Sequence, residues 1–77
     1  MPTRTFQLDN DFVELHVLLK LLGLAPSGGA AKGMIAAGDV SVEGVNETRK
    51  ACKIRGNQVV RVADDEIRVI GQIQGLT

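Results

Sequence analysis

The longest apolar pattern in the chain recurs every three or four residues and predicts a helix that runs to about Leu22. Asp11 and Glu14, which have the spacing of a capping box, predict where this helix begins. Gly23 is placed to end it with a left-handed stop. Because the apolar stripe is broad, we expect the helix to face both a sheet and another helix. The stripe contains Leu15, Leu18, Leu19 and Leu22, and it is widened by Val13, Val17, Leu21 and Leu24.

A second, shorter helix is predicted from about Gly28 to Ala37. Ser27 can act as its N-cap, because a serine hydroxyl accepts hydrogen bonds from the free N–H groups of the first turn. Pro26 restricts the residue before it to extended conformations, which separates the two helices. Lys32 falls away from the side that packs inward. That inward side consists of Ala31, Met34, Ile35 and Gly38.

Short alternating stretches elsewhere predict strands. Thr3 to Leu8 reads as an edge strand, and Asp39 to Val42 with Val45 to Thr48 reads as a hairpin around Glu43 and Gly44. Another strand region lies around Ile54 and Val59 to Val62, interrupted by Gly56 and Asn57. Asp64 and Asp65 then predict a turn before a last strand that contains Ile67, Val69 and Ile73, and Gln72 to Thr77 should fray. The expected fold is α+β, with two packed helices against a small, largely antiparallel sheet.

The composition supports one small domain. Its 77 residues, 44% of them hydrophobic, can build one core and no second one, so we expect a single domain over residues 1–77 with its core at about 11–70. The formal net charge is zero. Even so, five cations and no acid lie between Arg49 and Arg61. Tyr and Trp are absent, which removes the usual platforms for stacking on single-stranded bases.

Several function classes are disfavoured. Cys52 is the only cysteine, so an intramolecular disulfide and a cysteine-based metal site are both excluded. A lone thiol fits a cytoplasmic protein, and we read Cys52 as a structural, half-buried residue although neighbouring cations could lower its pKa. His16 has no partner nearby in sequence and is interpreted as a surface or boundary residue. We find no catalytic triad, no paired acid and base, no phosphate loop of the Walker type and no membrane-spanning stretch. We therefore expect no enzyme activity, no cofactor and no membrane partner.

The chain from about Leu15 to Val62, with the segment from Pro26 to Lys53 at its centre, resembles a known RNA-binding module. In chain order it has a Leu-Leu-Lys group with a later glycine, a Ser-Gly-Gly and Ala-Lys group, a Gly-x-Val group and a Glu-Thr-Arg group. The resemblance is to the αL motif of the domain typified by ribosomal protein S-four, and within that superfamily to the small stand-alone bacterial YbcJ-like proteins. The matching residues are Leu18 to Lys20, Gly23, Ser27 to Lys32, Ile35, Gly38, Val40, Val42, Gly44, Glu47 to Arg49, Lys53 and Ile54.

The resemblance implies a function in which a basic face grips the phosphate backbone of a structured RNA of the rRNA or tRNA class. Backbone N–H groups at the start of the second helix would add donors to an anion. We expect a monomer that binds RNA, alone or with a protein or ribonucleoprotein partner. The candidate RNA-binding residues are Lys32, Arg49, Lys50, Lys53 and Arg55 for charge, Ser27, Gly28 and Gly29 for the helix start, and Lys20 by the family pattern alone.

Other interpretations of the same residues stay open at this point. The cations could be a solvated face, and the Ser-Gly-Gly group could serve only a capped helix that packs tightly. On a regular strand Arg49, Lys53 and Arg55 would share one face and Lys50 the other. Glu43 and Glu47 bring acid close to the proposed surface. The rival functions are a protein-interaction domain that uses its edge strands and a DNA-binding domain, although the second helix has few side chains that could read bases. The sequence does not say which RNA is bound.

Overall fold

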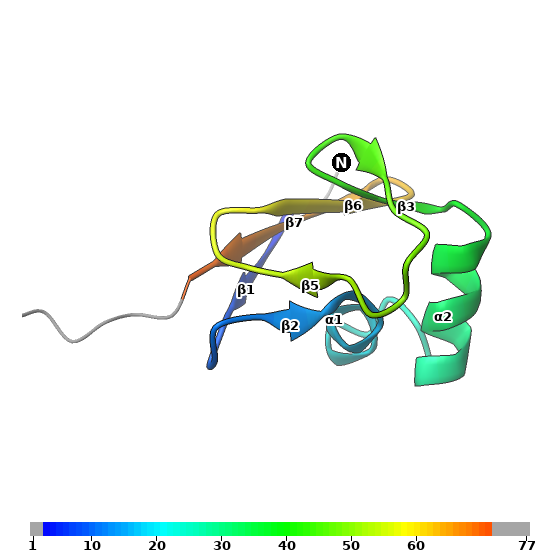
Figure 1. Ribbon diagram of the computed structural model, residues 1–77, viewed down its shortest axis with the longest axis horizontal. Coiled ribbons are helices and arrows are strands. Elements are labelled where there is room, and N and C mark those ends of the chain that lie inside the picture. The colour runs from blue at the N-terminus through cyan, green and yellow to red at the C-terminus, as the bar shows by residue number, and fades with distance from the viewer. Residues whose placement is uncertain (1–2, 72–77) are drawn as a thin grey trace, which may run out of the picture.

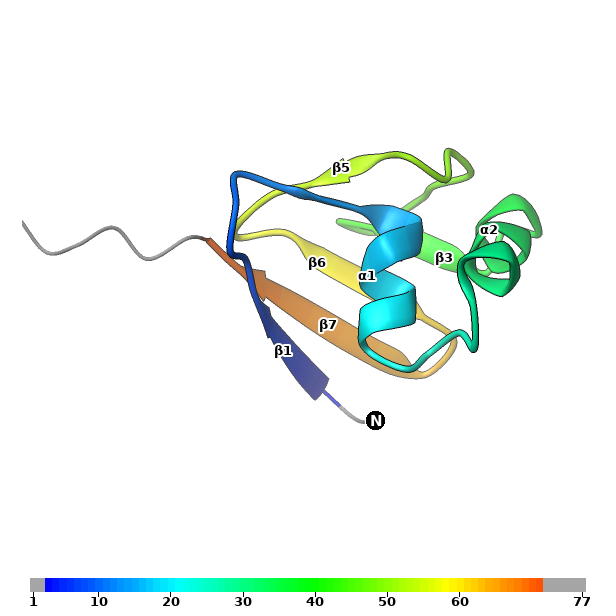
Figure 2. The same cartoon turned by 90° about the horizontal axis from the view of Figure 1, so that it is seen from below.

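The computed structural model describes residues 3–71, and these form a two-layer α+β arrangement (Figure 1). One layer is a five-stranded sheet in the order β1-β7-β6-β3-β4, and a separate ribbon pairs β2 with β5. Both helices lie on the same side of the larger sheet (Figure 2). The elements are β1 (Thr3–Gln7), β2 (Val13–Glu14), α1 (Leu15–Leu21), α2 (Gly28–Ala36), β3 (Val40–Val42), β4 (Val45–Asn46), β5 (Lys53–Ile54), β6 (Val59–Val62) and β7 (Asp65–Ile70).

The sheet is largely antiparallel, as predicted. Only β1 runs parallel to its neighbour, with a register from Thr3 opposite Glu66 to Gln7 opposite Ile70. The β3–β4 hairpin turns at Glu43 and Gly44, whose φ angles of 52° and 81° give the double positive φ of a type I′ turn. β1 also lies at an edge of the sheet, so the interpretation of Thr3 to Leu8 as an edge strand is confirmed.

Alternation along the strands places one apolar row of the sheet beneath the helices. Val60 and Val62 of β6 and Ile67 and Val69 of β7 are buried, whereas Arg61 between them is exposed. Burying a side chain of this size contributes about 1.5–3 kcal/mol, so this row and its helical partners supply most of the folding free energy. The partners include Leu15, Leu18 and Leu19 of α1 and Ala31 and Ile35 of α2.

Both helices end in the same way. Gly23 follows α1 with a φ of 76°, its N–H donates to the carbonyl of Lys20, and the N–H of Leu24 donates to the carbonyl of Leu19. Gly38 repeats this Schellman pattern after α2 with a φ of 85°. Ser27 is the N-cap of α2, as predicted, and its Oγ accepts from the backbone N–H of Ala30 at 3.1 Å.

The start of α1 differs from the prediction. The capping box was wrong, because α1 begins at Leu15, and Val13 and Glu14 form β2, which pairs with β5. The Leu15 N–H donates to the carbonyl of Cys52 at 2.9 Å and the His16 N–H to the carbonyl of Lys50 at 3.1 Å. Carbonyls from a distant loop therefore satisfy the free N–H groups that we had assigned to a local side chain.

Smaller boundaries also differ. β4 ends at Asn46, so Glu47 and Thr48 are not in a strand. The last turn lies at Ala63 and Asp64, one residue earlier than predicted, because Asp65 already pairs with Val62. The predicted strand position of Ile73 and the fraying of Gln72 to Thr77 lie outside the described residues.

Candidate nucleic-acid interface

Residues 47–52 form a cation-bearing loop between β4 and β5, and we call them the basic loop. In Figure 1 the loop runs from β4 down toward the start of α1, with α2 alongside, and Figure 2 shows it at the upper right, leading into β5. His16 donates through Nδ1 to the carbonyl oxygen of Lys50 at 2.8 Å, in addition to its backbone bond to the same oxygen. The backbone of Lys50 is therefore held at the helix start, while its side chain is exposed. His16 itself is a half-buried boundary residue that anchors the loop.

Glu47 organises the first half of the basic loop. Its carboxylate accepts from the backbone N–H of Arg49 at 3.0 Å and from the guanidinium of Arg49 at 2.8 and 3.2 Å. These hydrogen bonds lower the pKa of Glu47 to about 2 and raise the pKa of Arg49 above its usual value. The acid that we expected to weaken the surface thus serves as the internal partner of one arginine, and it leaves the other cations of the loop unmatched.

Cys52 closes the loop as a half-buried structural residue. Its N–H donates to the carbonyl of Arg49 at 3.2 Å, which makes a turn. Burial and the nearby Glu47 carboxylate raise the pKa of the Cys52 thiol, although Arg49 acts in the opposite direction. The neighbouring cations therefore do not activate the thiol.

The β2–β5 ribbon brings an aromatic ring to the cations. Val13 pairs with Ile54 and Glu14 with Lys53, so Lys53 and Arg55 share the face opposite the buried Ile54. The Lys53 Nζ lies 4.9 Å from the centroid of the Phe12 ring, and the guanidinium carbon of Arg55 lies 5.6 Å from it. Both separations are in the range of a cation–π contact. Sequence reasoning missed Phe12, because its partners lie about 40 residues along the chain.

The start of α2 presents a second patch. Gly28 and Lys32 are one turn apart and therefore lie on the same side of the helix. A Cβ added at Gly28 would meet no atom within 4 Å, and one added at Gly29 would meet only the hydroxyl of Ser27 at 3.9 Å. These glycines are therefore not required for tight packing, so the purely structural interpretation of the Ser-Gly-Gly group is wrong for the glycines. Gly29 is exposed and Gly28 is half-buried, so the start of α2 remains accessible to a ligand.

The structure brings some of the candidate residues together and leaves others apart. Arg49, Lys50, Lys53 and Arg55 follow one another along the basic loop and the ribbon. The strand-parity argument holds for Lys53 and Arg55, which both contact the Phe12 ring, but it was wrong for Arg49 and Lys50, because these two lie in the loop before β5. Lys20 is exposed and lies one turn after His16, on the side of α1 that faces the loop. Between α2 and the basic loop, the described residues form no hydrogen bond or ion pair.

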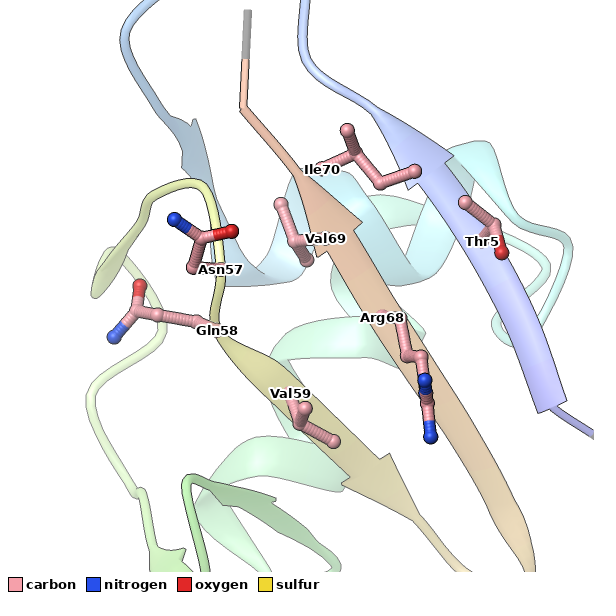
Figure 3. A pocket seen from close by; sticks show the side chains of 7 residues that line it. All are labelled: Thr5, Asn57, Gln58, Val59, Arg68, Val69 and Ile70. Carbon is pink, nitrogen blue, oxygen red and sulfur yellow. The ribbon is translucent and has the colours of Figure 1, made fainter.

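The open face of the larger sheet, on the side away from the helices, carries a depression. A depression of about 430 Å³ is lined by residues of three strands and by the turn before β6 (Figure 3). On this face, Arg61 and Arg68 both pair with Glu66, at 3.0 and 3.3 Å. The lining residues are Thr5, Asn57, Gln58, Val59, Arg68, Val69 and Ile70.

Residues 3–71 contain neither a metal-binding cluster of side chains nor a helix that could span a membrane. No group of three or more His, Cys, Asp or Glu side chains in this range is arranged to hold a metal ion. Within the same range, no helix has the length and apolar character needed to span a membrane. The cationic surface is thus the strongest candidate site in the described part of the chain.

Comparison with known proteins places this fold in a family. The "Putative RNA-binding protein YbcJ" of Escherichia coli (strain K12) is 48% identical over 67 residues, which cover 86% of this chain and 96% of that protein. The "Uncharacterized protein YbcJ" of Shigella flexneri matches equally well. The solution structure of E. coli YbcJ, described as revealing an αL motif involved in RNA binding, superposes with a TM-score of 0.68 at 47% identity, covering 87% of this chain and 86% of that one. Residues 6–70 match the S4 domain, and the chain therefore belongs to the S4 domain family.

Proposed function

We propose that this protein is a non-enzymatic RNA-binding module that contacts the phosphate backbone of a structured RNA. The observation that carries the proposal is the basic loop, which is hydrogen-bonded to the start of α1 and exposes Lys50, with the exposed Lys53 directly after it on β5. Its relatives of the same fold are described as RNA-binding, which supports the same ligand class. We further propose that residues 1–77 act as a single domain.

Phosphate contact suits these side chains better than the reading of base edges. Lysine ammonium groups are mobile point charges, and contacts to phosphate position a protein without reading sequence. Among residues 3–71, Arg49 of the basic loop has a carboxylate partner, whereas Lys50 of the loop and Lys53 of β5 have none, so a phosphate need not displace a carboxylate from either lysine. The N–H groups of Gly28 and Gly29, in the first turn of α2, would add donors beside Lys32. An RNA whose phosphate backbone reaches both the basic loop and the start of α2 would contact both patches.

The test is a fluorescence anisotropy titration of a structured RNA, a DNA duplex and a single-stranded RNA at two salt concentrations. We expect preference for the structured RNA and an affinity that falls by about 0.7–0.9 log units per log unit of salt for each phosphate contact. An Arg49→Ala/Lys53→Ala variant that keeps its circular dichroism spectrum should lose most of this binding. Equal binding to duplex DNA would favour a DNA-binding domain. Binding unaffected by the variant would refute the basic loop as the site.

A protein partner is the second candidate function, and the geometry of β1 favours it. β1 is an edge strand, so one side of its backbone has no strand to pair with among the described residues, and Thr5 lines the depression in the open face. An extended peptide could add to such an edge. This function predicts a complex that survives high salt and is lost when β1 carries a proline, for example Thr5→Pro. Salt-sensitive RNA binding that the same substitution leaves intact would argue against it.

A further inference from the structure

Phe12 borders two different features of the surface. The first is a pair of cations, Lys53 of β5 and Arg55 just after it, at 4.9 and 5.6 Å from the ring centroid. The ring also lines a hollow of about 210 Å³, to which β1, the segment after it, β2 and α1 contribute and β5 does not. Phe12 is the residue that these two features share.

The hollow is lined by six apolar residues and by two polar ones, Asp9 and Asn10. Val17 and Leu21, one turn apart on α1, form one wall, and Phe6 and Val13 contribute from the strands. Leu21 is 62% exposed, the highest exposure of any large apolar side chain in the described helices. A single exposed leucine is ordinary, but one that lines a hollow beside an aromatic ring and two cations is a candidate contact surface. Asn10 at the rim supplies an amide that can both donate and accept hydrogen bonds.

This combination matches the chemistry of one nucleotide. A nucleotide joins a flat, largely apolar ring system to anionic phosphates, and the protein places an apolar aromatic hollow next to two cations. A cavity of about 150 Å³ is sufficient for benzene, so a hollow of about 210 Å³ can take a single planar base. The geometry points to a site for one unpaired base of an RNA. The base stacks on Phe12 in the hollow while Lys53 and Arg55 hold the flanking phosphates.

This inference rests on the proposed function and adds selectivity to it. Phosphate contacts alone bind any RNA of suitable shape, so they give no preference for an unpaired nucleotide. A Phe12 that served only to hold the turn against β5 would affect all RNAs equally. The stacking site instead predicts tighter binding of RNA that carries a bulged base.

The experiment compares two hairpin RNAs that are identical except for one bulged nucleotide. We expect the natural protein to prefer the bulged hairpin by roughly 5- to 150-fold, the range for stacking one base on an aromatic ring. Phe12→Leu keeps an apolar side chain but removes the ring, so the preference should disappear while binding of the paired hairpin changes less than about twofold. Leu21→Gln should lose part of the preference. Val45→Ala, at an apolar residue 68% exposed on β4, is the matched control and should lose none.

A direct readout follows from the absence of Trp and Tyr in the chain. Phe12→Trp makes an indole the only such fluorophore, and stacking should quench its emission with the bulged hairpin and not with the paired one. Equal quenching by both hairpins, or equal loss of affinity for both in Phe12→Leu, would overturn the stacking site and leave the proposed function intact. Failure of the natural protein to bind either hairpin at low salt would overturn both.

Discussion

The basic loop and the open face of the larger sheet both carry cations, but these cations have different neighbours. On the sheet, one carboxylate, Glu66, pairs with both Arg61 and Arg68, and these contacts lower its pKa. In the basic loop and the adjoining β5, Glu47 pairs with Arg49, whereas Lys50 and Lys53 have no ion-pair partner among residues 3–71. The two regions therefore differ in how many of their cations remain unmatched after folding. The proposed function predicts that this number, rather than the total number of cations, decides which region binds RNA.

The difference has a structural cause. Arg61 and Glu66 are directly opposite each other on β6 and β7, and cross-strand neighbours have Cβ atoms only about 4.5–5.5 Å apart. The basic loop has no strand partner, and its backbone carbonyls instead accept from the first N–H groups of α1, which leaves the Lys50 side chain to solvent or to a ligand. Lys53 does lie opposite an acid, Glu14 of β2, but its ammonium contacts the Phe12 ring, and the Glu14 carboxylate lies 3.7 Å from His16 Nε2.

The largest expected effect comes from removing cations in one region at a time. Lys50→Gln/Lys53→Gln should weaken binding of structured RNA about tenfold to a hundredfold at low salt, and the salt slope should fall by about 1.4–1.8 if each lysine contacts one phosphate. Arg61→Gln/Arg68→Gln removes the same charge from the sheet and should change affinity less than about twofold. Titrations at four salt concentrations measure both. A comparable loss in the two variants would show that net charge, rather than location, decides binding.

The second effect concerns the junction of the two regions. Gly56 connects the ribbon to β6, and a Cβ at this position would collide with the backbone of Gly71. Gly56→Ala should therefore lower the free energy of unfolding by about 1–3 kcal/mol in urea denaturation. Gly33→Ala is the matched control, because its Cβ would meet nothing within 4 Å in the middle of α2, and it should stabilise the protein by about 0.5–1 kcal/mol. An unchanged unfolding midpoint for Gly56→Ala would mean that the ribbon can move relative to the sheet.

The third effect tests the internal ion pair of the basic loop. The pKa of Glu47 falls from 4.5 to about 2 on folding, so its stabilisation is complete above about pH 4.5 and is lost as the pH falls toward 2. Glu47→Gln should cost about 1 kcal/mol at pH 7, because Arg49 is 78% exposed and solvent screens the pair. Urea unfolding curves of the variant and the natural protein should converge near pH 2. In an Arg49→Gln background the same substitution should have little further effect.

The smallest expected effect tests whether unmatched cations are sufficient for RNA binding. Glu66→Gln frees Arg61 and Arg68 without adding a cation, so the sheet face should gain weak, salt-sensitive RNA affinity of about two- to threefold at low salt. When Glu66→Gln is combined with Lys50→Gln/Lys53→Gln, an anisotropy titration should show this gain above the weak residual RNA binding of the double variant. No gain there would mean that the shape of the basic loop, as well as its charge, is needed.

Much of the fold followed from local rules in the sequence. Helical periodicity and the Ser27 cap located α2, Gly23 located the end of α1, and alternation located the strands of the larger sheet. Gly38, which we expected on the inward side of the second helix, instead ends it with a positive φ. The candidate cations were also visible as a cluster, and the resemblance to the αL motif gave the family. Each of these signals depends on residues within about one turn or one hairpin of each other, so the chain itself carries them.

Only the tertiary structure decided how the cations are arranged and which of them are matched. β2 exists because Val13 meets Ile54, and α1 starts at Leu15 because carbonyls of Cys52 and Lys50 meet its first N–H groups. The placing of Phe12 beside Lys53 has the same origin. These contacts join residues more than 30 positions apart, and their hydrogen bonds replace local signals such as the Asp11 capping box. A long-range pairing leaves no periodicity in the sequence, so the local pattern could not reveal it.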